Sequence, residues 1–214
     1  MHSPKASDHR NRDMKIRQND REKWLVVLVL VVAISWGGCS SPQPIEAPPI
    51  AIDFDESLYG IWEDADQDCQ DTSQEVLIKK SWGGVTLSSN RCRVLEGTWF
   101  DPFTGQTLND TRGIAVDHFI SLPEVHRSGG EKWSKARRRE YGNDMTNPET
   151  LVVVSLSTKQ ERSGLDPADW IPPNPAVRCE YIRIWKQMKQ KWELTMDARE
   201  QAVVQWMSQK CGLQ

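Results

Sequence analysis

Apolar residues recur along this chain in short blocks, and the period of each block predicts a helix or a strand. An apolar trio at 76–78 follows the polar residues Asp71 and Thr72, which predicts a short helix capped by one of these two residues. The segment 151–156 should be a buried strand, because four of its first five residues are apolar and mostly β-branched. The other predicted elements are a hairpin within 93–108 that turns at DPFTG, a strand at 114–122, and helices at 133–141, 175–192 and 196–209.

The two C-terminal helices carry the clearest patterns. Asn174 should cap the first of them, with Pro175 at its first helical position, and Thr195 should cap the second. Ser134 is the expected cap of the basic helix at 133–141, and a loop should run from Ser157 to Asn174. The helix at 175–192 has an apolar stripe that should pack into the core, formed by Tyr181, Trp185, Met188 and Trp192. Its basic residues lie elsewhere on the helix and should face solvent: Arg178, Arg183, Lys186 and Lys189.

The N-terminal 39 residues predict export rather than a folded domain. A polar, charged stretch precedes an apolar run from Trp24 to Trp36, which is shorter than the ~20 residues that a membrane span needs and resembles the apolar region of a signal peptide. Small residues then precede Cys39, as at the processing site of bacterial lipoproteins, where the cysteine is lipidated. We therefore expect a membrane-anchored protein on the periplasmic face or the cell surface. An uncleaved signal anchor with Cys39 as a buried thiol is the alternative.

The composition of residues 40–214 predicts a tether followed by a folded domain. Residues 40–56 carry prolines and little to pack, which is typical of a tether, and residues 57–214 should form the folded domain. Residues 1–38 hold seven Lys and Arg against four Asp and Glu, so their removal changes the formal net charge from −3 to −6. Nucleic-acid binding by such a chain would have to be local.

Four cysteines besides Cys39 agree with an oxidising compartment. Four cysteines allow three pairings. We favour Cys69–Cys92 with Cys179–Cys211, because each bond then closes a short loop. Zinc ligation is disfavoured by the lack of paired Cys-x2-4-Cys spacing.

Two polar clusters raise the question of metal binding. Asp64, Asp66 and Asp68 resemble the start of a calcium loop, but the glycine and terminal glutamate of such a loop are missing, so a solvated turn is preferred. Asp117-His118 offers a carboxylate for a divalent cation and an imidazole for proton transfer. Adjacent strand residues point to opposite faces, so a structural pair is the alternative interpretation of this dipeptide.

The sequence around this dipeptide has the pattern of a known family. The segments CRVLEGTWFDPFTGQTL, VDHFISLPEVHRSGGEKWSKARRREYGND, NPETLVVVS and DPADWIPPNPAVRCEYIRIW follow one another in order. They resemble the HNH-type endonucleases that include the C-terminal domain of the GmrSD restriction enzymes and small secreted bacterial nucleases. The resemblance covers about residues 66–211.

This resemblance implies an α+β fold with a ββα-metal core and additional C-terminal helices. It implies that Asp117 holds one divalent cation, Mg²⁺ or similar, and that His118 is the base that activates water. The metal would offset charge on the phosphate while the neutral imidazole accepts a proton. The implied partner is nucleic acid, DNA ahead of RNA.

Two positions depart from the family pattern. Thr150 stands where the family has an Asn or His that braces the metal loop, and its hydroxyl can still make a bracing hydrogen bond. Lys159 stands where the family has an Asn or His that completes metal coordination, at the start of a helix. An ammonium group has no acceptor and cannot bind a metal unless it is deprotonated. Its charge can instead replace that of the metal in stabilising the phosphate, and an ordinary solvated lysine is the alternative interpretation. Ser121 replaces the usual Pro, and Glu161 or His126 are other groups that can complete a site.

Basic residues are candidate phosphate contacts, although a charge run is equally a solvated face. They are Arg127 and the run Arg137, Arg138 and Arg139. His126 is expected to make structural hydrogen bonds. Two functions follow as hypotheses: a membrane-tethered endonuclease-like lipoprotein that hydrolyses phosphodiesters, and a catalytically silent module that binds nucleic acid or an envelope protein.

Overall fold

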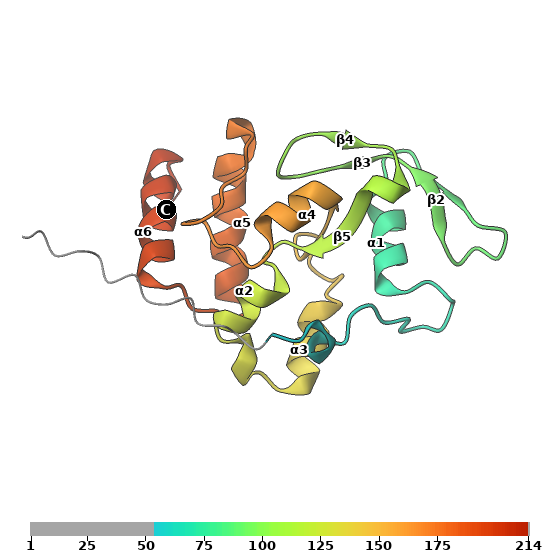
Figure 1. Ribbon diagram of the computed structural model, residues 1–214, viewed down its shortest axis with the longest axis horizontal. Coiled ribbons are helices and arrows are strands. Elements are labelled where there is room, and N and C mark those ends of the chain that lie inside the picture. Colours follow the sequence, from blue (N-terminus) through green and yellow to red (C-terminus); the bar gives the residue numbers. More distant parts are fainter. Residues whose placement is uncertain (1–53, 214) are drawn as a thin grey trace, which may run out of the picture. The chain divides into compact units, whose positions relative to one another are not determined.

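A computed structural model describes residues 54–213 of the chain (Figure 1). The predicted signal or lipoprotein segment 1–39, with Cys39, and most of the tether 40–56 lie outside the described residues. The folded unit begins before the expected Ser57, because Asp55 caps the short helix η1 and Phe54 packs against the core. None of the helices in the described part of the chain is long and apolar enough to cross a membrane.

The described residues form an α+β domain, as predicted, and their strands pair into three small antiparallel sheets. In order, its elements are η1 (Glu56–Tyr59), α1 (Thr72–Lys80), β1 (Val85–Leu87), β2 (Val94–Gly97), β3 (Trp99–Phe100), β4 (Thr107–Leu108), η2 (Thr111–Gly113), β5 (Ile114–His118), α2 (Leu122–Arg127), η3 (Gly130–Lys132), α3 (Lys135–Gly142), β6 (Leu151–Ser155), α4 (Leu156–Arg162), η4 (Pro175–Val177), α5 (Arg178–Lys191) and α6 (Ala198–Lys210). The sheets pair β1 with β2, β3 with β4, and β5 with β6.

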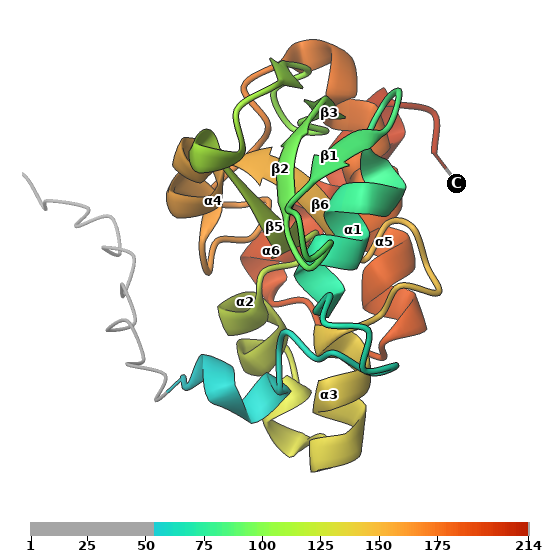
Figure 2. The same cartoon turned by 90° about the vertical axis from the view of Figure 1, so that its right-hand side faces the viewer.

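The sheet of β5 and β6 is the centre of the domain, and apolar side chains cover both of its faces. Val152 and Val154 belong to the core cluster with α5 and α6, whereas Leu151, Val153 and Val116 belong to the cluster with α1. Alternation along a strand produces this division. Figures 1 and 2 show α1 on one side of the sheet and α5 with α6 on the other. Burial on both faces explains why LVVV is continuously apolar.

Several sequence predictions are confirmed in detail. The side chain of Asp71 caps α1 and that of Ser134 caps α3. Asn174 caps the 3-10 turn that leads into α5, and the four stripe residues of α5 are buried. The hairpin at DPFTG is β3 and β4, although β2 pairs with β1 instead. The structure contains both expected disulfides, Cys69–Cys92 and Cys179–Cys211.

Three boundaries were predicted wrongly, and in two of them, those of α4 and α6, a side-chain cap was overlooked. The strand expected at 114–122 ends at His118, and Ser121 begins α2 with a proline in its first turn. The segment expected to be loop contains α4, whose first turn is held by the Ser155 hydroxyl, 3.1 Å from the amide of Thr158. The last helix is capped by Asp197 rather than Thr195.

Lys189 was expected to face solvent and is instead fully buried. Its ammonium group donates to Glu124 at 2.7 Å, to Ser128 at 2.6 Å and to the carbonyl of Thr195 at 2.8 Å. Glu200 of α6 lies 3.0 Å away and also accepts from the indole of Trp185. A buried ammonium is tolerated only when its donors are satisfied, and these partners join α2, α5 and α6.

The carboxyl of Glu200 should make the stability of the domain depend on pH. Burial raises its pKa from 4.5 to about 7, against the opposing effect of Lys189. A raised pKa in the folded state means that this group's contribution is present at low pH and is lost as the pH rises from about 4.5 to about 7. Between about pH 5 and pH 8, the free energy of unfolding of the wild type should fall by up to about 3 kcal/mol more than that of Glu200→Gln.

Urea denaturation across this pH range measures the difference, and the slope against pH is the readout. Glu161→Gln, at an exposed glutamate of α4, is the matched control and should keep the wild-type slope. Parallel curves for wild type and Glu200→Gln would contradict the prediction.

Candidate functional site

Asp117 and His118 lie side by side in β5 but on opposite faces of the sheet. Asp117 pairs with Val152 of β6, and His118 pairs with Leu151. These partners belong to the two different core clusters, so the carboxylate points towards α4 and α5 while the imidazole points towards α1 and α3. The two side chains therefore do not converge on one point in the structure.

A buried arginine of α4 binds the carboxylate of Asp117. The guanidinium of Arg162 makes an ion pair with Asp117, donates to the carbonyl of His118 at 2.9 Å, and donates to the carbonyl of Phe119. Its carbon centre lies 4.5 Å from the ring centroid of Phe103. Arg162 is 3% exposed and Asp117 is 7% exposed. A fixed cation therefore already balances the carboxylate of Asp117.

His118 is enclosed between two aromatic rings. The indole of Trp62 stacks on one side at 5.4 Å between ring centroids and the phenol ring of Tyr141 on the other at 5.3 Å. Its Nε2 donates to the carbonyl of Gly142 at 3.0 Å, and its Nδ1 has no hydrogen-bond partner among residues 54–213. Gly142 permits this arrangement, because a Cβ there would lie 2.4 Å from the carbonyl oxygen of Tyr59.

The imidazole of His118 is neutral at physiological pH. Burial lowers its pKa from 6.5 to about 4, with further lowering by Lys159 and Arg162, and the carboxylate of Asp117 opposes the shift without reversing it. A neutral imidazole can accept a proton. Its burial at 1% exposure means that a water molecule would reach it only if Trp62 moved.

An open groove lies on the His118 face of the sheet, next to α1 and α4. It has a volume of about 630 Å³, and Lys159, Arg93 and Arg112 lie along it with Trp62 and the apolar residues of β5. Lys159 has neither a hydrogen bond nor an ion pair to another residue in the described range. Arg112 is paired with Asp110 at 3.1 Å, with 89% of its own side chain exposed. The groove thus combines basic groups with one large aromatic ring.

Thr150, which stands at the family's bracing position, makes a buried hydrogen bond. Its hydroxyl donates to Asp144 at 2.7 Å, and the same carboxylate accepts from the ammonium of Lys191 at 2.8 Å. Both Thr150 and Asp144 are buried, so the pair holds the segment between α3 and β6 in place. These bonds hold the pKa of Asp144 below its usual value despite burial.

The arginines predicted to contact phosphate are all engaged within the domain. Arg127 binds Glu124, Arg137 binds Glu193 at 2.8 Å, and Arg138 donates to the carbonyl of Trp133 at 2.9 Å. Arg139 binds Glu63 at 2.6 Å. None of them lines the groove, and their contact with phosphate stays a prediction.

His126 does not join the other candidate residues. Its Nδ1 lies 3.4 Å from the hydroxyl of Tyr59, and its ring packs edge-on against Phe54. Glu161, the other alternative ligand, is exposed on α4. The structural role expected of His126 is the one its contacts support.

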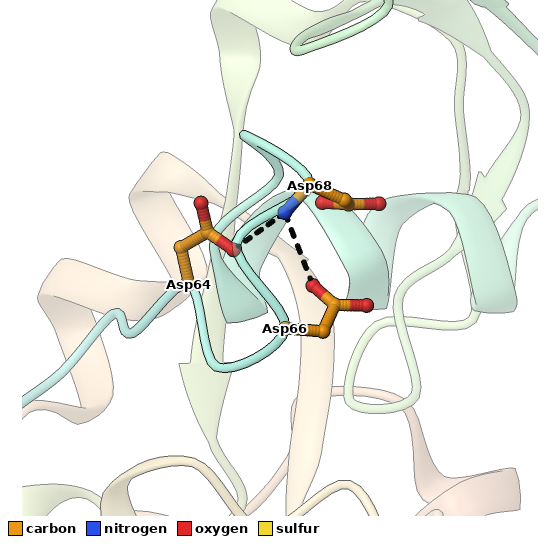
Figure 3. A group of neighbouring side chains, drawn as sticks. All are labelled: Asp64, Asp66 and Asp68. Atoms are coloured by element: carbon orange, nitrogen blue, oxygen red, sulfur yellow. Dashed lines mark hydrogen bonds between the residues drawn. The ribbon is translucent and has the colours of Figure 1, made fainter.

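Within the described range, one cluster has the geometry of three metal ligands, and it does not include Asp117. It consists of the exposed Asp64, Asp66 and Asp68 (Figure 3). Their carboxylates accept amide hydrogens of the same bend, for example that of Cys69 at 3.0 Å to Asp64. This is the exposed turn that the sequence favoured. Around Asp117 the donors do not fit a cation, because its single carboxylate is already paired with Arg162.

Comparison with known proteins gives one distant relative. The chain is 26% identical over 139 residues to an uncharacterized secreted protein of Arthroderma benhamiae, covering 65% of this chain and 67% of that protein. No family model matches the chain. No solved structure matches it either.

Arg162 is the site residue that sequence reasoning missed. If Ser155 is taken as a helix cap, the helix α4 follows it, and positions 158 and 162 share one face of that helix. The cap would therefore have indicated that Arg162 faces the domain. Thr158 and Arg162 are the two buried residues of this helix, and Thr158 donates to Asp101 at 3.0 Å. The enclosure of His118 by Trp62 and Tyr141 carries no comparable local signal.

Replacing Arg162 should destabilise the domain far more than replacing its neighbour Lys159. Arg162→Met leaves Asp117 buried without a counter-charge, and we expect a loss of about 3–5 kcal/mol in the free energy of unfolding. Lys159→Met removes a charge from the same helix at a half-exposed position and should change this free energy by about 0.5 kcal/mol or less. Chemical denaturation at neutral pH measures both, and similar losses would contradict the assignment.

The titration of His118 provides a separate test of its enclosure. A lowered pKa in the folded state contributes stability that is present above about pH 6.5 and is lost as the pH falls towards about 4. NMR of the imidazole should find the midpoint near 4 in the folded protein and near 6.5 in urea. A folded-state midpoint near 6.5 would show that the ring is solvated.

Proposed function

We propose that this chain is an exported HNH-like protein that binds nucleic acid through the groove of Trp62, Arg93, Arg112 and Lys159, without metal-dependent cleavage. The order of elements supports the HNH-like part of this proposal. The antiparallel strands β5 and β6 are followed directly by α4, which is the ββα order that the family resemblance implies. The insertion between the strands holds α2 and α3.

The groove supports the nucleic-acid part. Phosphate groups are bound by Lys and Arg, and unpaired bases stack on aromatic rings. Lys159 projects into the groove with no partner in the described range, so its ammonium is available for a phosphate oxygen. The contact would be local, as the negative net charge requires.

The ion pair between Asp117 and Arg162 is the observation that favours binding over cleavage in this proposal. A divalent cation needs several oxygen ligands, and here the candidate carboxylate is bound by a buried guanidinium with further bonds to two carbonyl groups. His118 faces away from this carboxylate. In this proposal the guanidinium of Arg162 takes the place beside Asp117 that the family resemblance assigns to the metal.

Phosphodiester hydrolysis is the second candidate, and His118 is the observation that favours it. Its imidazole is neutral, Gly142 fixes one ring nitrogen, and the other has no partner within residues 54–213. That is the state expected of a general base. The Trp62 ring covers it, so hydrolysis would require Trp62 to move.

Two further observations bear on location. The relative from Arthroderma benhamiae is named as secreted, and disulfides are typical of compartments outside the cytosol. Both support export of this chain. Lipidation at Cys39 and a membrane tether remain part of the proposal, resting on the sequence alone.

Binding and cleavage can be separated in one set of measurements on the full chain with its disulfides intact. Fluorescence anisotropy with labelled DNA and RNA, in EDTA, should show binding that weakens with salt. Lys159→Glu should weaken it about tenfold or more, because it puts a negative charge in the groove. Lys210→Glu, the same charge change at an exposed lysine of α6, should have little effect.

Plasmid incubated with Mg²⁺ or Mn²⁺ should remain uncleaved. Cleavage that His118→Ala abolishes would overturn the binding-only proposal in favour of hydrolysis. Absence of any binding, or equal losses in Lys159→Glu and Lys210→Glu, would rule out the groove.

A further inference from the structure

Two aromatic side chains are stacked on the surface away from His118. The rings of Trp82 and Phe100 are nearly parallel, with 9° between their planes and 5.6 Å between their centroids. Trp82 is 60% exposed and Phe100 is 37% exposed. Among the described residues, Trp82 is the most exposed of the large apolar side chains that the core leaves out. An indole this open to water has one face free to accept another ring.

The backbone holds this aromatic pair in place. The amide of Trp82 donates to the carbonyl of Thr98 at 2.7 Å, which ties the segment after α1 to the one before β3. Phe100 pairs with Thr107 in the β3–β4 hairpin. Below them, the indole of the buried Trp99 donates to the carbonyl of Leu77 at 2.7 Å. The pair is therefore fixed before any ligand arrives, which lowers the entropy cost of binding.

A cavity of about 420 Å³ opens beside the pair. Its inner wall is apolar, with Trp99 and Val153, and its rim carries the ammonium groups of Lys79 and Lys80. Lys79 donates to the carbonyl of Met145 at 3.1 Å and Lys80 to that of Pro148 at 2.7 Å. An ammonium has three donors, so each lysine keeps donors for an anion. The cavity thus combines a flat aromatic face with the two ammonium groups, and the carboxylate that also lines it, that of Glu149, is paired with Arg183.

We propose that this surface binds an unpaired nucleobase on the free face of Trp82, with Lys79 and Lys80 contacting the adjacent phosphates. The nucleic acid preferred by the protein is then single-stranded, because a base inside a duplex cannot stack on a side chain without leaving the helix. The two lysines favour a nucleotide over a neutral sugar, which would also stack on an aromatic ring. This inference rests on the proposed function, since it names the form of nucleic acid that the groove binds.

Helix α1 connects this surface to the groove. Gln74 and Leu77 line the groove, whereas Lys79 and Lys80 line the cavity. The rise along a helix places Gln74 and Lys80 only about 9 Å apart along the axis. A single strand of a few nucleotides is long enough to contact both sites.

Equilibrium binding of the full chain tests the proposal with three probes: a labelled single strand of about 12 nucleotides, the duplex of the same sequence, and a neutral cello-oligosaccharide. Trp82→Ala should weaken single-strand binding about 5- to 100-fold, the loss expected for one stacked base. Duplex affinity should stay within about twofold, and Trp82→Phe should recover most of the single-strand affinity. Trp206→Ala, at a tryptophan of α6 that is 56% exposed, is the matched control and should bind like the wild type.

An unchanged single-strand affinity in Trp82→Ala, or equal losses for single strand and duplex, overturns the proposal. If Trp82→Ala loses binding of the oligosaccharide but not of the single strand, the proposal is also overturned, since the surface would then be a carbohydrate-binding site. Lys159→Glu separates this inference from the proposed function. If Lys159→Glu weakens binding and Trp82→Ala does not, only the base-stacking site is wrong. If the wild type binds neither the single strand nor the duplex, both proposals fail.

Discussion

The guanidinium of Arg162 is the interaction on which the site depends. It binds a carboxylate and two main-chain carbonyl groups at the end of β5, and it packs on the ring of Phe103. A buried charge is costly unless its donors are satisfied, so this set of partners fixes α4 against the strand. The same bonds remove Asp117 from the surface. One set of contacts therefore decides both how the ββα segment packs and which group balances the charge of Asp117.

The central sheet separates the two residues that the sequence placed together. Because side chains alternate along β5, Asp117 enters the cluster of α4 and α5 and His118 enters the space between Trp62 and Tyr141. Apolar clusters cover both faces of this two-stranded sheet, so the two side chains enter different packed surroundings. The surface that remains accessible is the groove with Lys159. The proposed binding through that groove is compatible with this packing, in which Asp117 and His118 do not face the same site.

Local patterns predicted most of the elements, and the reasons for the failures are physical. The capping residues Asp71 and Ser134 predicted where α1 and α3 begin. The short spacing between cysteines favoured both disulfides. Helix α4 was missed because its residues are mostly polar and the Ser155 cap was overlooked. Its two buried residues, Thr158 and Arg162, bind partners that are distant in the sequence. Lys189 was misassigned for a related reason: helical periodicity treats every lysine as exposed, and only the distant Glu124 and Glu200 make its burial possible. The pairing of Asp117 with Arg162 likewise joins residues 45 positions apart.

The electrostatics of the domain limit how it can bind nucleic acid. The chain as a whole is acidic, and most arginines of α3 are neutralised by contacts within the domain. A small number of free cations makes few phosphate contacts, and the salt dependence of binding grows with that number. Stacking on an aromatic ring adds affinity that does not depend on counterion release. In the proposed binding mode, a combination of few charges and one rigid aromatic surface would make the affinity for nucleic acid less sensitive to salt than many basic contacts would.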